Sequence, residues 1–188
     1  MDMLITISGV PGSGKTTVGR LLSKHLGIPH VYAGDIYRQQ AAERGMTLAQ
    51  LNELAAKDHT IDKELDRRLA DFARAGGVVL EGRLAGFIAN EEKVDALKVW
   101  LTASDRVRAE RVAQREGADA ERILKENSAR HDSDAKRYKL IYGYDLDDTS
   151  IYDLSLTTDD ETPESIARQI LAAVEKRFGQ IVPTAVQE

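Results

Sequence analysis

Short apolar and β-branched runs alternate along the chain with longer stretches in which apolar residues recur every three or four positions. Residues 3–8 form the first such run, which ends at Gly9, a pattern typical of a parallel strand covered on both faces. The same pattern predicts further strands, which in chain order cover residues 30–33, 78–80, 97–101 and 152–156.

Helical spacing occupies the intervals between these runs. Val18, Leu22 and Leu26 recur on one helix face before Gly27, so we expect a helix directly after the first strand, over residues 16–26. Further helices are predicted over residues 35–44, 47–57, 61–75, 105–115, 119–141 and 162–178.

This alternation of strands and helices implies a parallel sheet with helices on both faces, and therefore the α/β class. A chain of 188 residues is long enough for one sizeable core, and no linker, internal repeat or low-complexity tract divides it. We expect a single domain over residues 1–180 and a flexible tail at 181–188.

Composition narrows the class of protein. With 42% hydrophobic and 30% charged residues, the chain has the balance of an ordinary globular protein. No apolar run approaches the roughly 18 residues of a spanning helix, and the amino terminus lacks the positive flank of a signal peptide, so we expect a cytoplasmic protein without membrane contact. A net charge of −5 argues against a non-specific binder of nucleic acid polymers. The absence of cysteine excludes disulfides, thiol catalysis and cysteine-based metal sites.

The strongest chemical signal follows the first strand. The phosphate-loop pattern G-x-x-x-x-G-K-[ST] is matched at every position by Gly9-Val10-Pro11-Gly12-Ser13-Gly14-Lys15-Thr16, with Thr17 next in the helix. A chance match is expected in on the order of 1% of chains of this length. The alternative is a glycine-rich turn with an incidental lysine, but the loop also joins a buried strand to a helix amino terminus, as phosphate binding requires.

Such a loop surrounds phosphate oxygens with backbone N–H groups. Lys15 is expected to reach the β- and γ-phosphates of ATP, and the Thr16 hydroxyl is expected to ligate Mg²⁺. The loop alone does not separate a kinase from a GTPase. The chain has no guanine-reading N-K-x-D pattern and is too short for a helicase or a transporter ATPase, which leaves a small-molecule kinase.

Three further stretches, in this order after the loop, resemble the archaeal-type cytidylate kinase family. They are Gly34-Asp35-Ile36-Tyr37-Arg38, Glu81-Gly82-Arg83-Leu84-Ala85-Gly86, and Tyr142-Gly143-Tyr144-Asp145 with Tyr152-Asp153-Leu154. The similarity runs from about residue 3 to residue 157. It implies transfer of a phosphoryl group from ATP to CMP or dCMP with Mg²⁺.

The resemblance also implies the nucleoside monophosphate kinase fold, with a five-stranded parallel sheet between helices. Its core would comprise residues 1–34, 77–110 and 142–180, the monophosphate-binding insertion residues 35–76, and the lid with its following helix residues 111–141.

Residue by residue, the resemblance implies an acceptor site. Arg38 in the Gly34–Arg38 stretch, and Arg83 after Gly82 at the end of the third strand, would hold the acceptor phosphate. An arginine fork suits two phosphate oxygens better than a lysine does. A solvated arginine on a helix face is the alternative for Arg38.

The metal site is expected at the tip of the third strand. Glu81 would hold Mg²⁺ through water, since this ion keeps several waters and takes few protein ligands. Asp35 is a weaker candidate for the same shell. The alternatives are a strand-end carboxylate for Glu81 and stabilisation of a helix amino terminus for Asp35.

Two arginine groups complete the implied site. Arg108, Arg111 and Arg115 would share one face of the lid helix, with Arg111 stacked on adenine and Arg115 touching ATP phosphate. The neighbouring Glu110, Glu116 and Glu121 leave a solvated ion-pair face as the alternative.

The pattern R-x-x-x-D-x-x-R at Arg130, Asp134 and Arg137 resembles the stretch that holds monophosphate and ribose. A surface salt-bridge ladder is its alternative.

Base recognition stays open. Either Arg67 or Arg68 would contact the nucleotide, but adjacent helix positions point in different directions. Bacterial relatives carry an aspartate that helps read the base where this chain has Leu84. The four histidines have no metal-ligand spacing and are expected to be structural or exposed; they are His25, His30, His59 and His131.

Two rival functions remain. One is a kinase for another acceptor, such as AMP, UMP or a small metabolite, and the other is an ATP-binding switch that performs no transfer. The expected partners are ATP and CMP or dCMP, and the expected state is a monomer.

Overall fold

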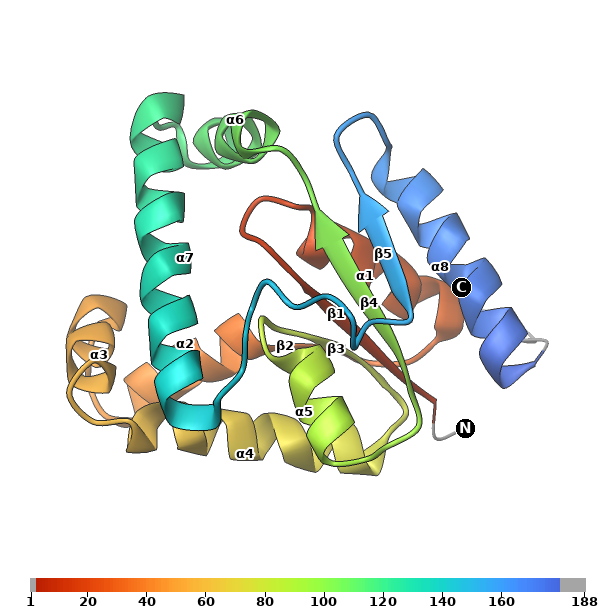
Figure 1. The fold of residues 1–188 in the computed structure, drawn as a ribbon, viewed down its shortest axis with the longest axis horizontal. Coiled ribbons are helices and arrows are strands. Elements are labelled where there is room, and N and C mark those ends of the chain that lie inside the picture. Colours follow the sequence, from red (N-terminus) through yellow and green to blue (C-terminus); the bar gives the residue numbers. More distant parts are fainter. Residues whose placement is uncertain (1–2, 180–188) are drawn as a thin grey trace.

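The computed structural model describes residues 3–179, which form a parallel sheet of five strands in the order β2-β3-β1-β4-β5, with helices on both faces (Figure 1). All four strand pairs are parallel. The strands are β1 Leu4–Gly9, β2 His30–Tyr32, β3 Val78–Glu81, β4 Ala96–Thr102 and β5 Leu154–Thr157. The predicted fold class and the five predicted strands are confirmed.

Eight helices connect and flank the strands of the described chain. They are α1 Lys15–Leu26, α2 Ala33–Glu43, α3 Leu48–Ala55, α4 Thr60–Ala75, α5 Ala85–Glu91, α6 Asp105–Glu116, α7 Ala120–Tyr142 and α8 Pro163–Phe178. Three of these helices have a side-chain cap at the amino terminus, namely α3, α7 and α8. Thr47 and Gln50 form a capping box, Asp119 accepts from the Arg122 N–H, and Thr162 precedes Pro163.

The strand boundaries differ from the prediction by one or two residues, and two of these differences have a visible cause. Strand β2 ends at Tyr32, because Ala33 already belongs to α2. Strand β5 begins at Leu154, two residues later than predicted, because the N–H of Tyr152 donates to the Thr149 carbonyl in a turn. Tyr152 therefore packs on Trp100 from a loop, with ring centroids 5.2 Å apart.

Helix α5 is not predicted at all by the apolar pattern. Its first five residues, Ala85 to Ala89, are all buried, so it has no polar face and no helical period to detect. The N–H of Gly86 donates to the Ser8 hydroxyl at 3.1 Å, and a Cβ at Gly86 would lie 2.4 Å from the Tyr152 ring. The helix thus lies closely against β1 and the loop before β5.

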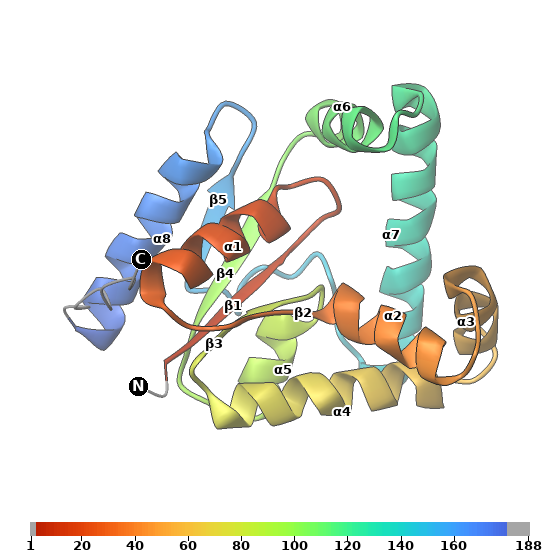
Figure 2. The ribbon, with the colours of Figure 1, turned by 180° about the vertical axis from the view of Figure 1, so that it is seen from behind.

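The two faces of the sheet have separate cores. Ile5 and Ile7 of β1 pack with α1 and α8 on one face, the nearer face in Figure 2. Leu4 and Leu80 pack with α4 and α5 on the other. Because both faces are covered, every residue of β1 is buried, as expected for a central parallel strand.

Two helical units project beyond the carboxyl ends of the strands (Figure 1). The first comprises α2, α3 and the start of α4, with a small apolar cluster around Leu51 and Ile61. The second comprises α6 and α7, which pack through Val112 and Ile123. These units correspond to the predicted insertion and lid, whose domain limits stay a prediction. The predicted flexible tail at 181–188 lies outside the described residues.

Within residues 3–179, no helix has the length and apolar character needed to cross a bilayer.

Candidate active site

The phosphate loop lies at the carboxyl end of the central strand β1. Gly9 has φ of 144°, and a Cβ there would lie 1.9 Å from the Leu101 carbonyl oxygen, so only glycine fits between β1 and β4. The loop then folds around the Val10 carbonyl, which accepts from Ser13 Oγ at 2.9 Å and from Lys15 Nζ at 2.7 Å. The Lys15 ammonium is thereby turned back over the loop.

The first helix of the lid lies directly on this loop. Gly12 has φ of 81°, and a Cβ there would lie 2.7 Å from the Arg108 carbonyl oxygen. The Arg108 guanidinium donates to the Pro11 carbonyl at 3.3 Å and also pairs with Asp105. A movement of α6 would therefore displace the loop directly.

Thr158 joins the same loop to Arg111. Its hydroxyl donates to the Ser13 carbonyl at 3.2 Å, while the Arg111 guanidinium donates to Thr158 Oγ1 at 2.9 Å and to the Thr158 carbonyl at 2.6 Å. Sequence reasoning did not single out Thr158. The only signal for it was its place directly after β5, at the edge of the sheet where ligands bind in α/β proteins.

The expected metal side of the site contains a buried carboxylate. Glu81 is 1% exposed, and its Oε1 accepts from Thr16 Oγ1 at 2.8 Å. Its other oxygen, Oε2, lies 2.9 Å from His30 Nε2. This hydroxyl and this carboxylate supply the hard oxygen donors that suit Mg²⁺. Among the described residues, no cluster of three or more histidine, aspartate or glutamate side chains could hold a metal by itself.

Four charged side chains, from α4, α7 and the segment after β3, lie together near the loop. Arg83 Nη1 lies 2.7 Å from Asp134 Oδ2, and Arg137 Nη2 lies 3.0 Å from Asp134 Oδ1. The Arg137 Nε lies 3.0 Å from Asp62 Oδ2. Sequence reasoning found three of these residues and missed Asp62. Both oxygens of Asp134, expected to bind ribose, lie against arginines in this structure.

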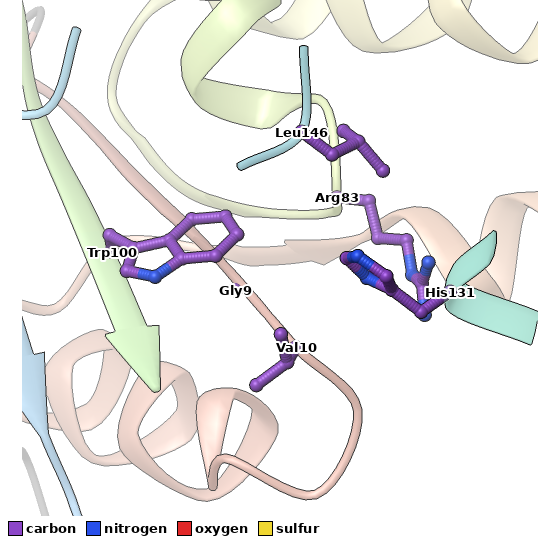
Figure 3. A pocket seen from close by; sticks show the side chains of 6 residues that line it. All are labelled: Gly9, Val10, Arg83, Trp100, His131 and Leu146. Carbon is purple, nitrogen blue, oxygen red and sulfur yellow. The ribbon is translucent and has the colours of Figure 1, made fainter. Parts of the chain in front are cut away.

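Arg83 also faces the phosphate loop. It lines a narrow pocket with Gly9 and Val10 of the loop, and with Trp100, His131 and Leu146 (Figure 3). The two predicted phosphate sites thus border one pocket. His131 is half-buried there, with Nε2 3.3 Å from Asp147 Oδ1.

Other predicted acceptor residues lie away from this cluster. Arg38 is 51% exposed; it pairs with the exposed Asp35 one turn earlier and lies over the Tyr32 ring. The Tyr37 hydroxyl donates to Asn52 Oδ1 at 2.9 Å, which ties α2 to α3. In this arrangement Arg38 is the solvated arginine on a helix face that was its alternative interpretation, and its partner is Asp35.

The adjacent arginines of α4 point to different surroundings. Arg68 donates to Glu43 at 2.8 Å and to Glu64 at 3.0 Å, within an ion-pair group that includes Arg44. Arg67 instead lines a pocket of about 310 Å³ between α4, α5 and the end of α7. Leu84 lines the same pocket. Of the two, Arg67 therefore has the open surroundings that a ligand needs.

The three lid arginines divide between two kinds of environment. Arg108 and Arg111 contact the loop and Thr158, as described above. Arg115 is 69% exposed and pairs with Glu116 at 2.6 Å, the solvated ion pair that was its alternative. Arg130 belongs to α7, but its side chain lies outside the described structure.

A second aspartate of α4 has a perturbed acidity. The Tyr142 hydroxyl donates to Asp66 Oδ2 at 2.5 Å. Burial raises the pKa of Asp66 to about 7, although the Tyr142 bond and Arg137 act in the opposite direction, and Asp62 and Glu91 add to the rise. The neutral form of this carboxyl is therefore favoured by folding.

This predicts a pH-dependent stability difference between the wild type and Asp66→Asn. A group whose pKa is raised from 3.8 to about 7 stabilises the fold fully below pH 4, and this contribution is lost as the pH rises through 7. The amide stays neutral at every pH, so at pH 8 the free energy of unfolding of the variant should exceed that of the wild type by on the order of 2 kcal/mol. This value is smaller than the full pKa change would give, because the side chain is not fully buried and water screens part of the effect.

Urea unfolding between pH 4.5 and pH 8 measures this difference. Asp71→Asn, on the same helix but in an exposed pair with Arg74, is the control and should show no such slope. A constant difference between Asp66→Asn and the wild type at all pH values would contradict the assignment of a raised pKa to Asp66.

Comparison with known protein families agrees with these geometric features. The cytidylate kinase-like family model matches residues 4–160. The chain is 48% identical over 173 residues to a cytidylate kinase of Methanopyrus kandleri, covering 86% of this chain and 90% of that relative. It is 44% identical over 179 residues to a cytidylate kinase of Pyrococcus abyssi, covering 95% of this chain and 97% of the relative.

Solved structures share the fold at low sequence identity. A shikimate kinase from Aquifex aeolicus superposes with a TM-score of 0.57 at 22% identity, covering 93% of this chain and 97% of that one. A gluconokinase from Sinorhizobium meliloti has a TM-score of 0.61 at 17% identity and covers 93% of both chains. At these identities the likeness concerns the fold alone.

Proposed function

The chain belongs to the cytidylate kinase-like family, and from this premise we propose that it transfers the γ-phosphoryl group of ATP to CMP or dCMP, with Mg²⁺ as cofactor. The products are ADP and CDP or dCDP. One observation carries the proposal in the structure: Arg83 borders the same pocket as Gly9 and Val10 of the phosphate loop (Figure 3). A donor phosphate on the loop and an acceptor phosphate on Arg83 would therefore face each other.

On the donor side, the loop residues Gly9, Pro11, Gly12, Ser13, Gly14 and Thr17 surround the phosphates of ATP. Lys15 leaves the Val10 carbonyl for the β- and γ-phosphates. Arg111, beside Thr158 at the carboxyl edge of the sheet, stacks on adenine. Arg115 exchanges its exposed partner Glu116 for ATP phosphate when the lid closes.

On the acceptor side, Arg83 and Arg137 hold the monophosphate and Asp134 accepts from the ribose. Arg38, together with Gly34 and Tyr37 in α2, approaches from the insertion, and Gly82 places Arg83 at the tip of β3. Arg130 joins them from α7. Arg67 lies in the larger pocket toward the base. Ribose binding requires Asp134 to release part of its contact with an arginine.

Mg²⁺ would be held by the Thr16 hydroxyl and, through water, by Glu81. When bound it neutralises charge that develops on the transferred group. The Thr16–Glu81 contact of 2.8 Å supports this pairing, since both oxygens then border the same site.

Phosphoryl transfer requires alignment and neutralised charge more than covalent chemistry, so the reaction proceeds by direct in-line displacement. Lys15, Arg83, Arg115 and Arg137 surround the group in transfer, and Arg38 holds the acceptor. Closure of residues 35–75 and 111–130 excludes water and suppresses hydrolysis of ATP. The enzyme acts as a cytoplasmic monomer, and neither nucleic acid polymers nor membranes are partners.

A coupled assay of ADP release tests the proposal with CMP, dCMP, UMP, AMP and GMP as acceptors. CMP or dCMP should give the highest kcat/KM, and ADP release without an acceptor should be slower by at least about 100-fold, because acceptor binding drives the closure that assembles the catalytic groups around the γ-phosphate. Equal release with and without acceptors would favour an ATPase or a nucleotide-binding switch. A clear preference for AMP or UMP would assign the same chemistry to another acceptor.

A further inference from the structure

Asp62, in the first turn of α4, is a buried acid to which none of the predicted roles applies. The residue is 3% exposed, although an acid that merely stabilises a helix amino terminus would lie in solvent. Its carboxylate faces α7, with Oδ2 at 3.0 Å from Arg137 Nε. A carboxylate removed from water needs a charged partner, and Arg137 supplies it.

The Arg137 guanidinium is held from two sides. Its Nε edge faces Asp62, while Nη2 faces Asp134 Oδ1 at 3.0 Å. The group also lies over the Tyr138 ring, with 5.2 Å from Cζ to the ring centroid. Since a guanidinium is planar, two carboxylates on different edges and a ring on one face fix both its position and its plane.

These contacts continue to Arg83. Asp134 holds Arg137 with one oxygen and Arg83 with the other, so the order is Asp62, Arg137, Asp134, Arg83. The chain of contacts joins α4 of the insertion to α7 and to the segment after β3. Asp62 lies at its buried end, with a side chain 4% exposed against 22% for Arg137.

We propose that Asp62 is a positioning residue that orients Arg137 to receive the acceptor monophosphate. The inference rests on the proposed function, because it assumes that Arg137 binds that phosphate. Asp62 itself does not touch the substrate. It fixes one edge of the guanidinium from behind, so that binding the phosphate does not have to restrict a mobile arginine.

A positioning role and a purely electrostatic role of Asp62 predict opposite changes in the KM for CMP when its carboxylate is neutralised. If Asp62 acted only through its charge, its neutralisation would strengthen the attraction of Arg137 for phosphate and lower the KM for CMP. If it positions Arg137, its neutralisation loosens the guanidinium and raises that KM. The titratable groups that interact electrostatically with Asp62 come from α7 and from the α4 segment. They are Arg137, Asp134, Tyr138 and Tyr142, and His59 and Asp66.

The test is a double-mutant cycle of Asp62→Asn and Arg137→Ala in steady-state kinetics. Asp62→Asn alone should raise the KM for CMP by about 10-fold, with kcat changed less than about 3-fold and the KM for ATP unchanged. In the Arg137→Ala background, Asp62→Asn should add less than about 2-fold, because its effect passes through Arg137. Asp71→Asn, an exposed acid of the same helix, is the matched control and should leave all constants unchanged.

A lower KM for CMP in Asp62→Asn, an unchanged one, or additive effects in the cycle would overturn the inference. If the amide variant does not fold, Asp62→Glu keeps the charge but moves the carboxylate by one methylene, and should raise the KM for CMP at least about 3-fold; an unchanged KM there would equally overturn it. A wild type without activity on CMP or dCMP would refute the proposed function as well. An active wild type with additive effects refutes the role of Asp62 alone.

Discussion

Replacement of Lys15 by alanine is expected to lower kcat for CMP phosphorylation by about 100-fold or more, the usual size of a lost electrostatic contact in a transition state. Lys15 is the first residue of α1, and its ammonium lies 2.7 Å from the Val10 carbonyl within the loop. From there, rotation about its own side-chain bonds would bring the ammonium to a phosphate bound on the loop. No other lysine belongs to residues 9–17.

Initial rates at saturating ATP and CMP measure this effect, and thermal unfolding shows whether the variant is folded. Lys24→Ala is a suitable control, since Lys24 is an exposed lysine near the other end of the same helix. It should retain wild-type rates. If Lys15→Ala kept more than about a third of the wild-type kcat, Lys15 would not be the residue that contacts the transferred phosphate.

The sheet and the phosphate loop could be predicted because their signals are local. A buried strand that ends in Gly9, followed by a helix that begins at Lys15, is a continuous stretch of sequence. Within it, Gly9 and Gly12 have close backbone neighbours, and Gly14 has a positive φ that favours glycine. Helix α5 could not be predicted in this way. Its apolar residues follow each other without a period, because sheet, α4 and Tyr152 surround it.

The candidate site shows the same limit for single side chains. Arg83 and Arg137 stand in recognisable motifs, but Asp62 is an ordinary first-turn acid in sequence. The role that we propose for it depends on a contact that forms only when α4 and α7, distant in the chain, bring Asp62 Oδ2 to 3.0 Å from Arg137 Nε. Thr158 was missed for the same reason, since its partner Ser13 lies far away in sequence. The contact of His30 with Glu81 could not be predicted either, although a structural role for this histidine was expected.

The second large effect concerns the acceptor side. Arg83→Lys should lower kcat/KM for CMP by about 100-fold, although the positive charge is kept. The arginine is 14% exposed, lies 2.7 Å from Asp134 Oδ2 and borders the phosphate loop. Its fork can hold Asp134 and an acceptor phosphate at the same time. An ammonium is a single point of charge on a flexible stem, so lysine would hold one of the two partners and leave the other poorly placed.

The choice of lysine separates this geometric requirement from simple loss of charge. Because Arg83→Lys can still pair with Asp134, the buried carboxylate keeps a cation and the fold should survive. The KM for ATP should stay within about 2-fold of the wild-type value, since the donor phosphates are expected on the loop rather than on Arg83. Arg106→Lys is the control, because Arg106 is 81% exposed on α6 and pairs only weakly with Glu110, at 3.6 Å. Equal losses of kcat/KM for ATP and for CMP would mean that Arg83 maintains the structure of the whole site. A loss confined to CMP supports its contact with the acceptor.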